Sequence, residues 1–188
     1  MAEIVLCRHA ATEHNLTKRF LSTTDLPLGA HGREQCARLR EALERLPFER
    51  CLVSPMRRCL ETRELVAPQV PFDVKPALRE VDFGTWEGQT LAWAEHHAPE
   101  LLALRRRDPV HFRPPGGESI ADAAERLRPL ASALLPDGTT LIVGHRITLG
   151  ILERLLRGLP LDSKAVEPLE TAQFRVVASS ELHSATER

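Results

Sequence analysis

The sequence has no C-x-x-C pair and no cysteine with a histidine at zinc-finger spacing, so a structural zinc site is not expected. Reduced and mostly buried thiols are expected instead at its four cysteines, which are Cys7, Cys36, Cys51 and Cys59. No run approaches the roughly 20 consecutive apolar residues of a membrane span, and no secretory leader pattern follows Met1. We therefore expect a cytoplasmic protein with no membrane partner.

The sequence also has no large excess of positive or of negative residues. Lys and Arg number 25 against 26 Asp and Glu, a net charge of −1, so no overall positive field attracts nucleic acid. Neither a P-loop nor a G-x-G-x-x-G motif occurs, which argues against a nucleotide cofactor. We expect neither a nucleic-acid partner nor a cofactor, and the sequence leaves the oligomeric state open.

The 188 residues, 43% of them hydrophobic, suit a single globular domain. Short apolar runs predict strands over residues 4–7, 51–53, 72–74, 140–143 and 174–177. Amphipathic patterns predict helices over 32–46, 57–66, 120–135 and 147–156, with Ser119 and Asp122 forming a capping box before the third. This alternation predicts a three-layer α/β/α sandwich with a mostly parallel sheet covered by helices on both faces.

Residues 76–118 interrupt the alternation. They contain Trp86, Trp93 and the basic run 105–107, and they end in the turn-rich segment 113–117. We expect one domain over residues 1–188, in which 76–118 form a small cap insertion over the edge of the sheet that selects the substrate. The arginine run 105–107 is typical of a solvated helical face, and a rim that attracts anionic substrates is the alternative.

Charged side chains directly follow three of the predicted strands. They are Arg8, His9, Arg57, Arg58, His145 and Arg146. Because the carboxyl ends of parallel strands meet at one edge of a sheet, we expect these side chains to lie together. Planar guanidinium groups suit the oxygens of phosphate, and Glu80 would add a proton donor beside them. The pattern predicts a phosphate site with an acid at its side.

Six short motifs occur in a characteristic order. Residues 6–15 (LCRHAATEHN) are similar to R-H-G-x-T-x-x-N, and residues 54–62 (SPMRRCLET) to S-x-x-x-R-x-x-x-T. The other four motifs are DLPL with GREQ (25–28 and 32–35), LREVDFGTWEG (78–88), PGGES (115–119) and VGH (143–145). Together they resemble the histidine phosphatase superfamily over nearly the whole chain, in the branch of phosphoglycerate mutases and α-ribazole phosphatases.

The resemblance implies a metal-independent phosphomonoesterase, similar to α-ribazole-phosphate phosphatases, that hydrolyses small phosphorylated metabolites through a phosphohistidine. His9 would be the nucleophile, neutral at its attacking nitrogen and held by a backbone carbonyl at the other. Glu80 would protonate the leaving oxygen, with Asp82 in reserve, and His145 would hold phosphoryl oxygens, preferably as a cation. The residues expected to bind substrate are Arg8, Thr12, Asn15, Ser22, Arg57 and Arg146.

Three positions depart from the family pattern. Ala10 and Ala11 stand where the family has Gly followed by Glu or Gln, and Arg146 stands where it commonly has a small residue. A methyl group at position 10 demands a backbone conformation open to residues other than glycine. These changes also suggest an alternative function, a phosphate-ligand-binding protein that has lost catalysis.

Two other enzyme interpretations were weighed. Cys51 and Arg57 fit the C-x5-R spacing of cysteine-based phosphatases, but Pro55 lacks an N–H and the loop has no glycine, so we reject that mechanism. Mutase-type phosphoryl transfer remains an alternative, although the compact insertion favours hydrolysis. The substrate stays open among α-ribazole phosphate, phosphoglycerates, sugar phosphates and nucleoside monophosphates.

Overall fold

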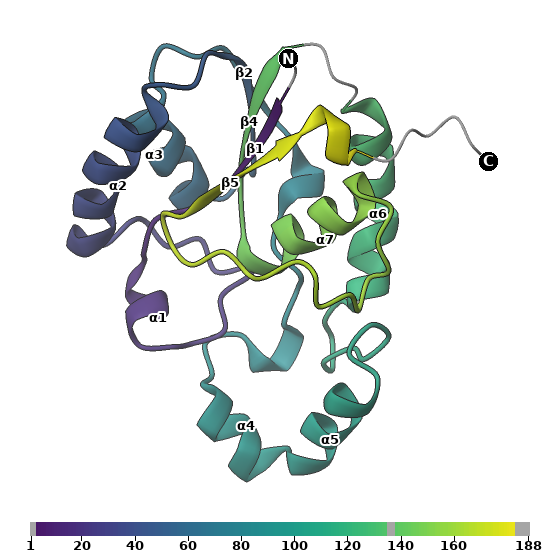
Figure 1. The fold of residues 1–188 in the computed structure, drawn as a ribbon. Coiled ribbons are helices and arrows are strands. Elements are labelled where there is room, and N and C mark those ends of the chain that lie inside the picture. Colours follow the sequence, from purple (N-terminus) through teal and green to yellow (C-terminus); the bar gives the residue numbers. More distant parts are fainter. Residues whose placement is uncertain (1–2, 135–137, 183–188) are drawn as a thin grey trace.

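A five-stranded sheet runs through the middle of the computed structural model, which describes residues 3–134 and 138–182 (Figure 1). The strands are β1 (Glu3–Arg8), β2 (Phe48–Val53), β3 (Phe72–Val74), β4 (Thr139–Gly144) and β5 (Phe174–Ala178). Their order is β3-β2-β4-β1-β5, and only β5 runs antiparallel to its neighbour. The mostly parallel α/β sheet expected from the sequence is confirmed.

Helices cover both faces of this sheet because its inner strands are apolar on both sides. On one face, α2 (Ala30–Leu43) and α3 (Arg57–Val66) pack against β-strand residues such as Val5 and Cys7. On the other face, α6 (Ile120–Ala133) and α7 (Arg146–Leu156) pack against Ile4 and Leu6. The alternation of side chains along β1 thus divides the core into two layers, as the expected sandwich requires.

The predicted helix boundaries differ from the observed ones by a few residues. The range 57–66 coincides with α3, whereas α2 begins and ends earlier than the predicted 32–46. Ahead of α6, Ser119 Oγ accepts a hydrogen bond from the Asp122 N–H at 3.1 Å, and the Asp122 carboxylate accepts one from the Ser119 N–H at 2.8 Å. That capping box is confirmed, while residue 135, the predicted end of the helix, lies outside the described residues.

The segment 76–118 forms two 3-10 turns, η1 (Pro76–Leu78) and η2 (Gly84–Trp86), followed by α4 (Leu91–His97) and α5 (Pro99–Arg107). Figure 1 shows α4 and α5 beyond the carboxyl ends of the strands. These elements enclose a small core of their own, which comprises Phe83, Trp86, Ala94 and Leu102. Neither α4 nor the four-residue α1 (Glu13–Leu16) was predicted, because such short helices show little periodicity.

The two ends of this segment meet at its base. Thr85 N–H donates to the Pro115 carbonyl at 3.0 Å, and Glu118 N–H donates to the Asp82 carbonyl at 2.9 Å. Gly84 has a φ of +51°, and a side chain there would overlap the backbone of residues 115–117. Glycine is therefore required where these two stretches of backbone touch.

A 3-10 turn, η3 (Ser179–Glu181), follows β5. Across residues 3–134 and 138–182, no helix combines the length and apolar character needed to cross a membrane.

Candidate functional site

A cavity of about 530 Å³ opens at the carboxyl end of β1, bounded by the start of α7 on one side and by α5 on the other. Five of the predicted site residues line it: Arg8, His9, Asn15, Glu80 and Arg146. Its volume lies within the range of about 300–1,000 Å³ that is usual for small-molecule sites. The edge of the sheet thus brings two arginines, a histidine and an acid of the predicted site to one cavity. This cavity is larger than a phosphate ion requires.

His9 is held at the floor of this cavity by backbone contacts. Its N–H donates to the Gly144 carbonyl of the neighbouring strand at 3.0 Å. Its ring nitrogen Nδ1 lies 2.8 Å from the Ala10 carbonyl oxygen. Because a carbonyl can only accept a hydrogen bond, Nδ1 carries the proton, and Nε2 keeps its lone pair. The ring therefore has the tautomer that a nucleophilic Nε2 requires.

The surroundings of His9 also keep it neutral. Burial lowers the pKa of His9 well below its ordinary value, and the positive charges of Arg58 and Arg8 lower it further. Both effects disfavour a second proton on the ring. The lone pair on Nε2 is therefore available at neutral pH.

The turn after His9 is anchored by two polar side chains. The Ala10 N–H donates to Thr62 Oγ1 at 3.0 Å, and the Ala11 N–H donates to Gln35 Oε1 at 2.9 Å. Neither alanine has a positive φ. The backbone at position 10 is therefore open to an L-residue, and the methyl group that replaces the family's glycine is accommodated without strain.

His145 lies behind His9, with ring centroids 5.1 Å apart. Its Nε2 is 2.8 Å from Ser54 Oγ, and its Nδ1 accepts a hydrogen bond from Arg58 Nε at 3.3 Å. Burial, followed by the charge of Arg58, lowers the pKa of His145 well below its ordinary value. These effects favour a neutral His145, in contrast to the cation expected from the sequence, because the Arg58 guanidinium lies beside this buried ring.

Arg8 is buried at the cavity wall. One of its terminal nitrogens donates to the Leu169 carbonyl at 2.9 Å, and the same nitrogen lies 3.5 Å from the Glu170 carboxylate. Its Nε is buried and has no hydrogen-bond partner among the described residues. A buried donor without a partner is costly, so an oxygen-rich anion would be stabilised beside it.

The structure does not bring Arg57 to this site. Its side chain is 58% exposed and pairs with Glu61 at 2.6 Å on the outside of α3. Arg58 points inward instead and is fully buried, with terminal nitrogens that donate to the carbonyls of Thr24 (3.0 Å) and Ser22 (2.9 Å). Successive residues on a helix point about 100° apart, so only one of the two arginines can face the histidines.

The spacing in the sequence already contained the signal for Arg58. In the S-x-x-x-R-x-x-x-T motif, counting four residues on from Ser54 or four back from Thr62 gives position 58. Ser54 and Thr62 are both fully buried, and Thr62 Oγ1 donates a hydrogen bond to the Arg58 carbonyl at 2.7 Å.

Glu80 lines the same cavity as Arg8. Its carboxylate accepts hydrogen bonds from the N–H groups of Val81, Ile147 and Thr148 and from the Thr148 hydroxyl, at 3.0–3.2 Å. These donors fix the carboxylate at the first turn of α7. Asp82, the reserve acid, instead accepts from the Gly84 N–H at 2.8 Å and lines a neighbouring hollow.

Two further predicted substrate ligands lie outside the main cavity. Thr12 is fully buried, and its hydroxyl donates to Asn15 Oδ1 at 3.0 Å, so it orients the Asn15 side chain that does line the cavity. The Ser22 hydroxyl donates to Glu87 at 2.6 Å and accepts from the Phe83 N–H at 3.1 Å. These internal hydrogen bonds engage both hydroxyl groups, which explains why neither projects into the cavity.

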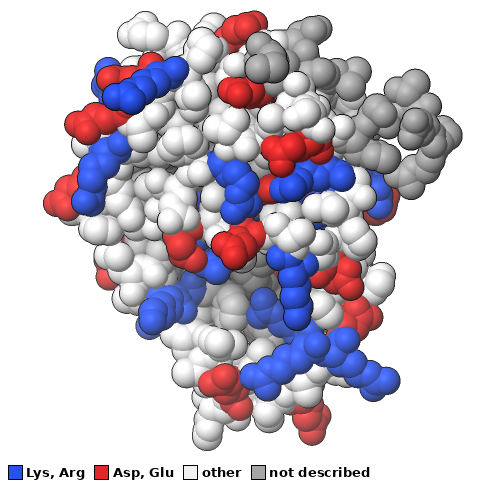
Figure 2. Space-filling view, viewed as in Figure 1, with Lys and Arg blue, Asp and Glu red and all other residues white. Residues whose placement is uncertain are grey.

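Arg146 lines the cavity, and its terminal nitrogen Nη1 is 2.8 Å from Glu170. Figure 2 shows basic side chains gathered on this face of the molecule, over α5 and beside a hollow. Among residues 3–134 and 138–182, no group of three or more His, Cys, Asp or Glu side chains could hold a metal ion. The basic side chains that line the cavity are Arg8, Lys18, Arg19, Arg105 and Arg146.

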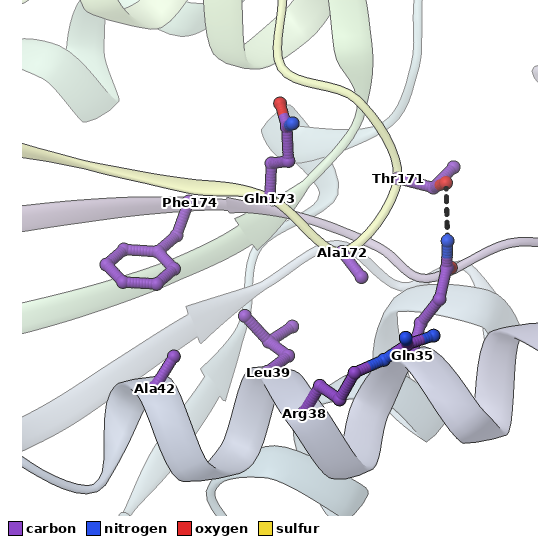
Figure 3. A pocket seen from close by; sticks show the side chains of 8 residues that line it. All are labelled: Gln35, Arg38, Leu39, Ala42, Thr171, Ala172, Gln173 and Phe174. Atoms are coloured by element: carbon purple, nitrogen blue, oxygen red, sulfur yellow. Dashed lines mark hydrogen bonds between the residues drawn. The ribbon is translucent and has the colours of Figure 1, made fainter.

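A second hollow lies between α2 and residues 171–174 (Figure 3). Leu39 and Ala42 of α2 face Ala172 and Phe174 there, and Gln35 Nε2 donates to Thr171 Oγ1 at 3.2 Å. Arg38 is its one charged lining residue. Its lining, as far as the described residues go, includes no acid, histidine or thiol.

Comparison with known proteins agrees with this geometry. Residues 4–186 match the family model of the histidine phosphatase superfamily (branch 1). The chain is 31% identical over 172 residues to glucosyl-3-phosphoglycerate phosphatase of Mycolicibacterium vanbaalenii, which covers 85% of this chain and 76% of the relative. It is also similar to the α-ribazole phosphatase structure from Shigella flexneri, with a TM-score of 0.82, 26% identity and coverage of 94% and 90% of the two chains.

A third relative is a larger protein. The bifunctional 6-phosphofructo-2-kinase/fructose-2,6-bisphosphatase 1 of Mus musculus is 32% identical over 151 residues, which cover 79% of this chain. The matched region spans 31% of that relative's length.

Proposed function

This chain is a phosphatase that belongs to the histidine phosphatase superfamily, and we propose that it hydrolyses small phosphorylated metabolites through a phosphohistidine formed on His9. The observation that carries the proposal is the 2.8 Å contact between His9 Nδ1 and the Ala10 carbonyl, because it leaves Nε2 unprotonated in the cavity. Proximity to Arg8 and Arg58 supports the same assignment, since phosphoryl transfer depends on positioning and on stabilising charge.

In the first step, Nε2 of His9 attacks phosphorus and the bond from phosphorus to the leaving oxygen breaks. The Glu80 carboxyl group gives its proton to that oxygen, and the alcohol departs. In the second step, water attacks phosphorus, Glu80 takes up a proton from the water, and the N–P bond breaks. Phosphate leaves, and both His9 and Glu80 return to their starting protonation states.

Arg8 and the buried Arg58 supply positive charge on this pathway, and Asn15 offers an amide donor at the cavity wall. Arg58 takes the position beside the histidines that the sequence had assigned to Arg57. The reaction is proposed to need no metal ion, because these guanidinium groups can stabilise the equatorial oxygens of the transferred group.

The substrate is proposed to be a phosphate monoester with an organic body, as in α-ribazole-phosphate phosphatases. Similarity to proteins named α-ribazole phosphatase and glucosyl-3-phosphoglycerate phosphatase supports this class. A cavity of about 530 Å³ supports a body larger than the phosphoryl group itself.

The decisive experiment follows phosphate release from a panel of phosphate monoesters in the presence of a chelator, together with mass spectrometry of protein quenched in alkali. We expect release from the native protein and a phosphoryl group on His9, with neither in His9→Ala. His96→Ala, at an exposed histidine of α4, serves as the matched control. Undiminished release by His9→Ala, or loss of release in the chelator, would contradict the proposal. Transfer of the phosphoryl group to an added alcohol without phosphate release would indicate a mutase.

A further inference from the structure

The hydroxyl group of Thr148 lies between two acceptors. Thr148 is fully buried in the first turn of α7, and its Oγ1 is 2.7 Å from the Arg79 carbonyl oxygen and 3.0 Å from Glu80 Oε1. A hydroxyl group has one proton, and a backbone carbonyl can only accept a hydrogen bond. The proton of Thr148 can therefore serve only one of these two oxygens at a time.

The Arg79 carbonyl oxygen has a second donor. Arg126 of α6 donates to it through Nη2 at 3.0 Å. The same guanidinium group also donates to the Ala77 carbonyl, so it holds the backbone that leads to Glu80. Thr148 can consequently turn its hydroxyl proton away from residue 79, because Arg126 still donates to that carbonyl.

The two carboxyl oxygens of Glu80 differ in the hydrogen bonds that they accept. Oε1 lies 3.0 Å from the backbone nitrogens of both Val81 and Thr148, whereas Oε2 accepts from one N–H group of the described residues, that of Ile147 at 3.2 Å. Two N–H donors leave Oε1 little room for a proton of its own, so the reacting proton belongs on Oε2. Oε1 is then the oxygen that Thr148 contacts when the carboxyl group loses its proton.

We propose that Thr148 is a positioning residue whose hydroxyl proton follows the charge of Glu80. The proton points to the Arg79 carbonyl while Glu80 is protonated, and it points to Oε1 while Glu80 is ionised. The inference rests on the proposed function, in which Glu80 gives a proton to the leaving oxygen and later takes one from water. Thr148 gains and loses no proton in either step, because its hydroxyl group only rotates.

This rotation has a consequence for the first step of the reaction. A hydrogen bond to an ionised carboxylate is stronger than one to a neutral group. The hydroxyl group of Thr148 therefore stabilises the carboxylate that remains after Glu80 has given up its proton, and it makes Glu80 a better proton donor. The benefit is largest for substrates whose leaving oxygen cannot depart without a proton.

The dependence of kcat/KM on the leaving group tests this role, because kcat/KM covers the reaction up to departure of the alcohol. Glycerol 3-phosphate needs a proton on its leaving oxygen, and p-nitrophenyl phosphate does not. Thr148→Val removes the hydroxyl group at similar size. We expect it to lower kcat/KM about five- to tenfold for glycerol 3-phosphate and less than about twofold for p-nitrophenyl phosphate, since only part of the carboxylate charge has developed in the transition state.

Two controls separate the hydroxyl group from packing. Thr148→Ser keeps a hydroxyl group and should retain the native ratio of the two kcat/KM values within about twofold. Thr139→Val makes the same change at a buried position at the amino end of β4, away from the cavity, and should leave both values unchanged. If Thr148→Val does not fold, Thr148→Cys takes its place, because a thiol is a weak donor. An equal fall for both substrates, or the same fall in the ratio with the serine variant, would overturn the inference.

Glu80→Gln separates failure of this inference from failure of the proposed function. If Glu80→Gln lowers the ratio and Thr148→Val does not, Glu80 is the acid and the inference is wrong. If Glu80→Gln leaves the ratio unchanged, the assignment of the acid and the inference fail together, whereas phosphate release that still requires His9 keeps the phosphohistidine mechanism. In the double variant, Thr148→Val should lower the ratio no further, because its effect passes through Glu80. An additive fall would also overturn the inference.

Discussion

Glu170 holds two arginines of the cavity at once: its carboxylate lies 2.8 Å from Arg146 and 3.5 Å from Arg8. The same carboxylate is 60% exposed at the cavity lining. An incoming phosphoryl group therefore has to compete with a resident carboxylate for these guanidinium groups. Arg146, which departs from the family pattern, is thus neutralised within the protein itself.

Replacement of Glu170 by Gln should strengthen anion binding. Removing an exposed carboxylate that pairs with a cation is worth about 0.2–1 kcal/mol, so we expect the inhibition constant for inorganic phosphate to fall by up to about fivefold. Steady-state inhibition of phosphate-ester hydrolysis measures this constant. Glu64→Gln, at an exposed position on α3, makes the same change in net charge, and an equal effect there would refute a local role for Glu170.

Arg57 and Arg58 are adjacent in the sequence, but we expect their replacement to affect kcat/KM very differently. Arg58→Gln should lower kcat/KM by about 100-fold or more, because it removes a buried charge beside both histidines. Arg57→Gln should change kcat/KM by less than about twofold, because its exposed side chain pairs with Glu61. Rates with phenyl phosphate decide between them, and thermal melts show whether each variant is folded. A severe loss in the folded Arg57 variant alone would restore the first assignment.

Glu80 is expected to matter most for substrates with poor leaving groups. Without its proton, an alkyl phosphate must expel an alkoxide, so Glu80→Gln should lower kcat by a factor of about 10²–10⁴ for glycerol 3-phosphate. The loss should be much smaller for p-nitrophenyl phosphate, whose leaving group needs no proton. Asp82→Asn is the matched control, since Asp82 lines the neighbouring hollow. Equal losses for both substrates would argue against general acid catalysis by Glu80.

The sequence predicted the sheet, the principal helices and the location of the site for identifiable reasons. Buried strands leave unbroken apolar runs such as residues 4–7, and parallel strands bring Arg8 and His9 to the same edge as His145. What it could not supply was the direction of each side chain. Only packing shows that the Ser22 hydroxyl is engaged by Glu87, whereas the motif spacing did mark Arg58 and was not followed to that position.

Charge contacts between residues far apart in the sequence could not be predicted either. The resemblance implied a cationic His145, but the guanidinium of Arg58 lies against its ring in the folded chain. The three arginines at 105–107 were likewise indistinguishable in the sequence. The structure separates the half-buried Arg105 from its exposed neighbours.

Buried His9 and His145 should make the protein sensitive to acid. Both have pKa values lowered well below the ordinary 6.5, so the unfolded chain takes up protons below that pH before the folded chain does. Their contribution to stability is present above pH 6.5 and is lost as the pH falls through it. We expect the unfolding free energy to decrease between pH 7 and pH 5, because protonation then favours the unfolded chain.

Urea denaturation of single variants measures this linkage. His145→Gln should show a shallower fall in stability between pH 7 and pH 5 than the native protein. His96→Gln, at an exposed position, should keep the native slope. Parallel slopes for the native protein and His145→Gln would mean that His145 does not contribute.

Gly32 allows α2 to approach the turn that follows His9. A side chain at this position would overlap the Ala11 carbonyl, so Gly32→Ala should displace the helix from the turn. Overpacking of this kind costs about 1–3 kcal/mol of stability, and kcat should fall with it because Ala11 is anchored through Gln35 of the same helix. Gly29→Ala is the control, since its new methyl group would meet backbone atoms no closer than 3.8 Å. Unfolding free energies and rates of both variants test the difference.

The contact between residues 82–85 and 115–118 affects how this protein can be re-engineered. Because the backbones near Gly84 and Gly117 touch, the segment between them leaves and re-enters the sheet layers at one point. Its small core around Trp86 packs largely apart from the two layers that flank the sheet. An exchange of residues 85–114 for the equivalent segment of a relative therefore has to match this junction and also the backbone hydrogen bonds that Gly88 and Gln89 form with Phe20, and it would leave His9 and its anchoring contacts in place.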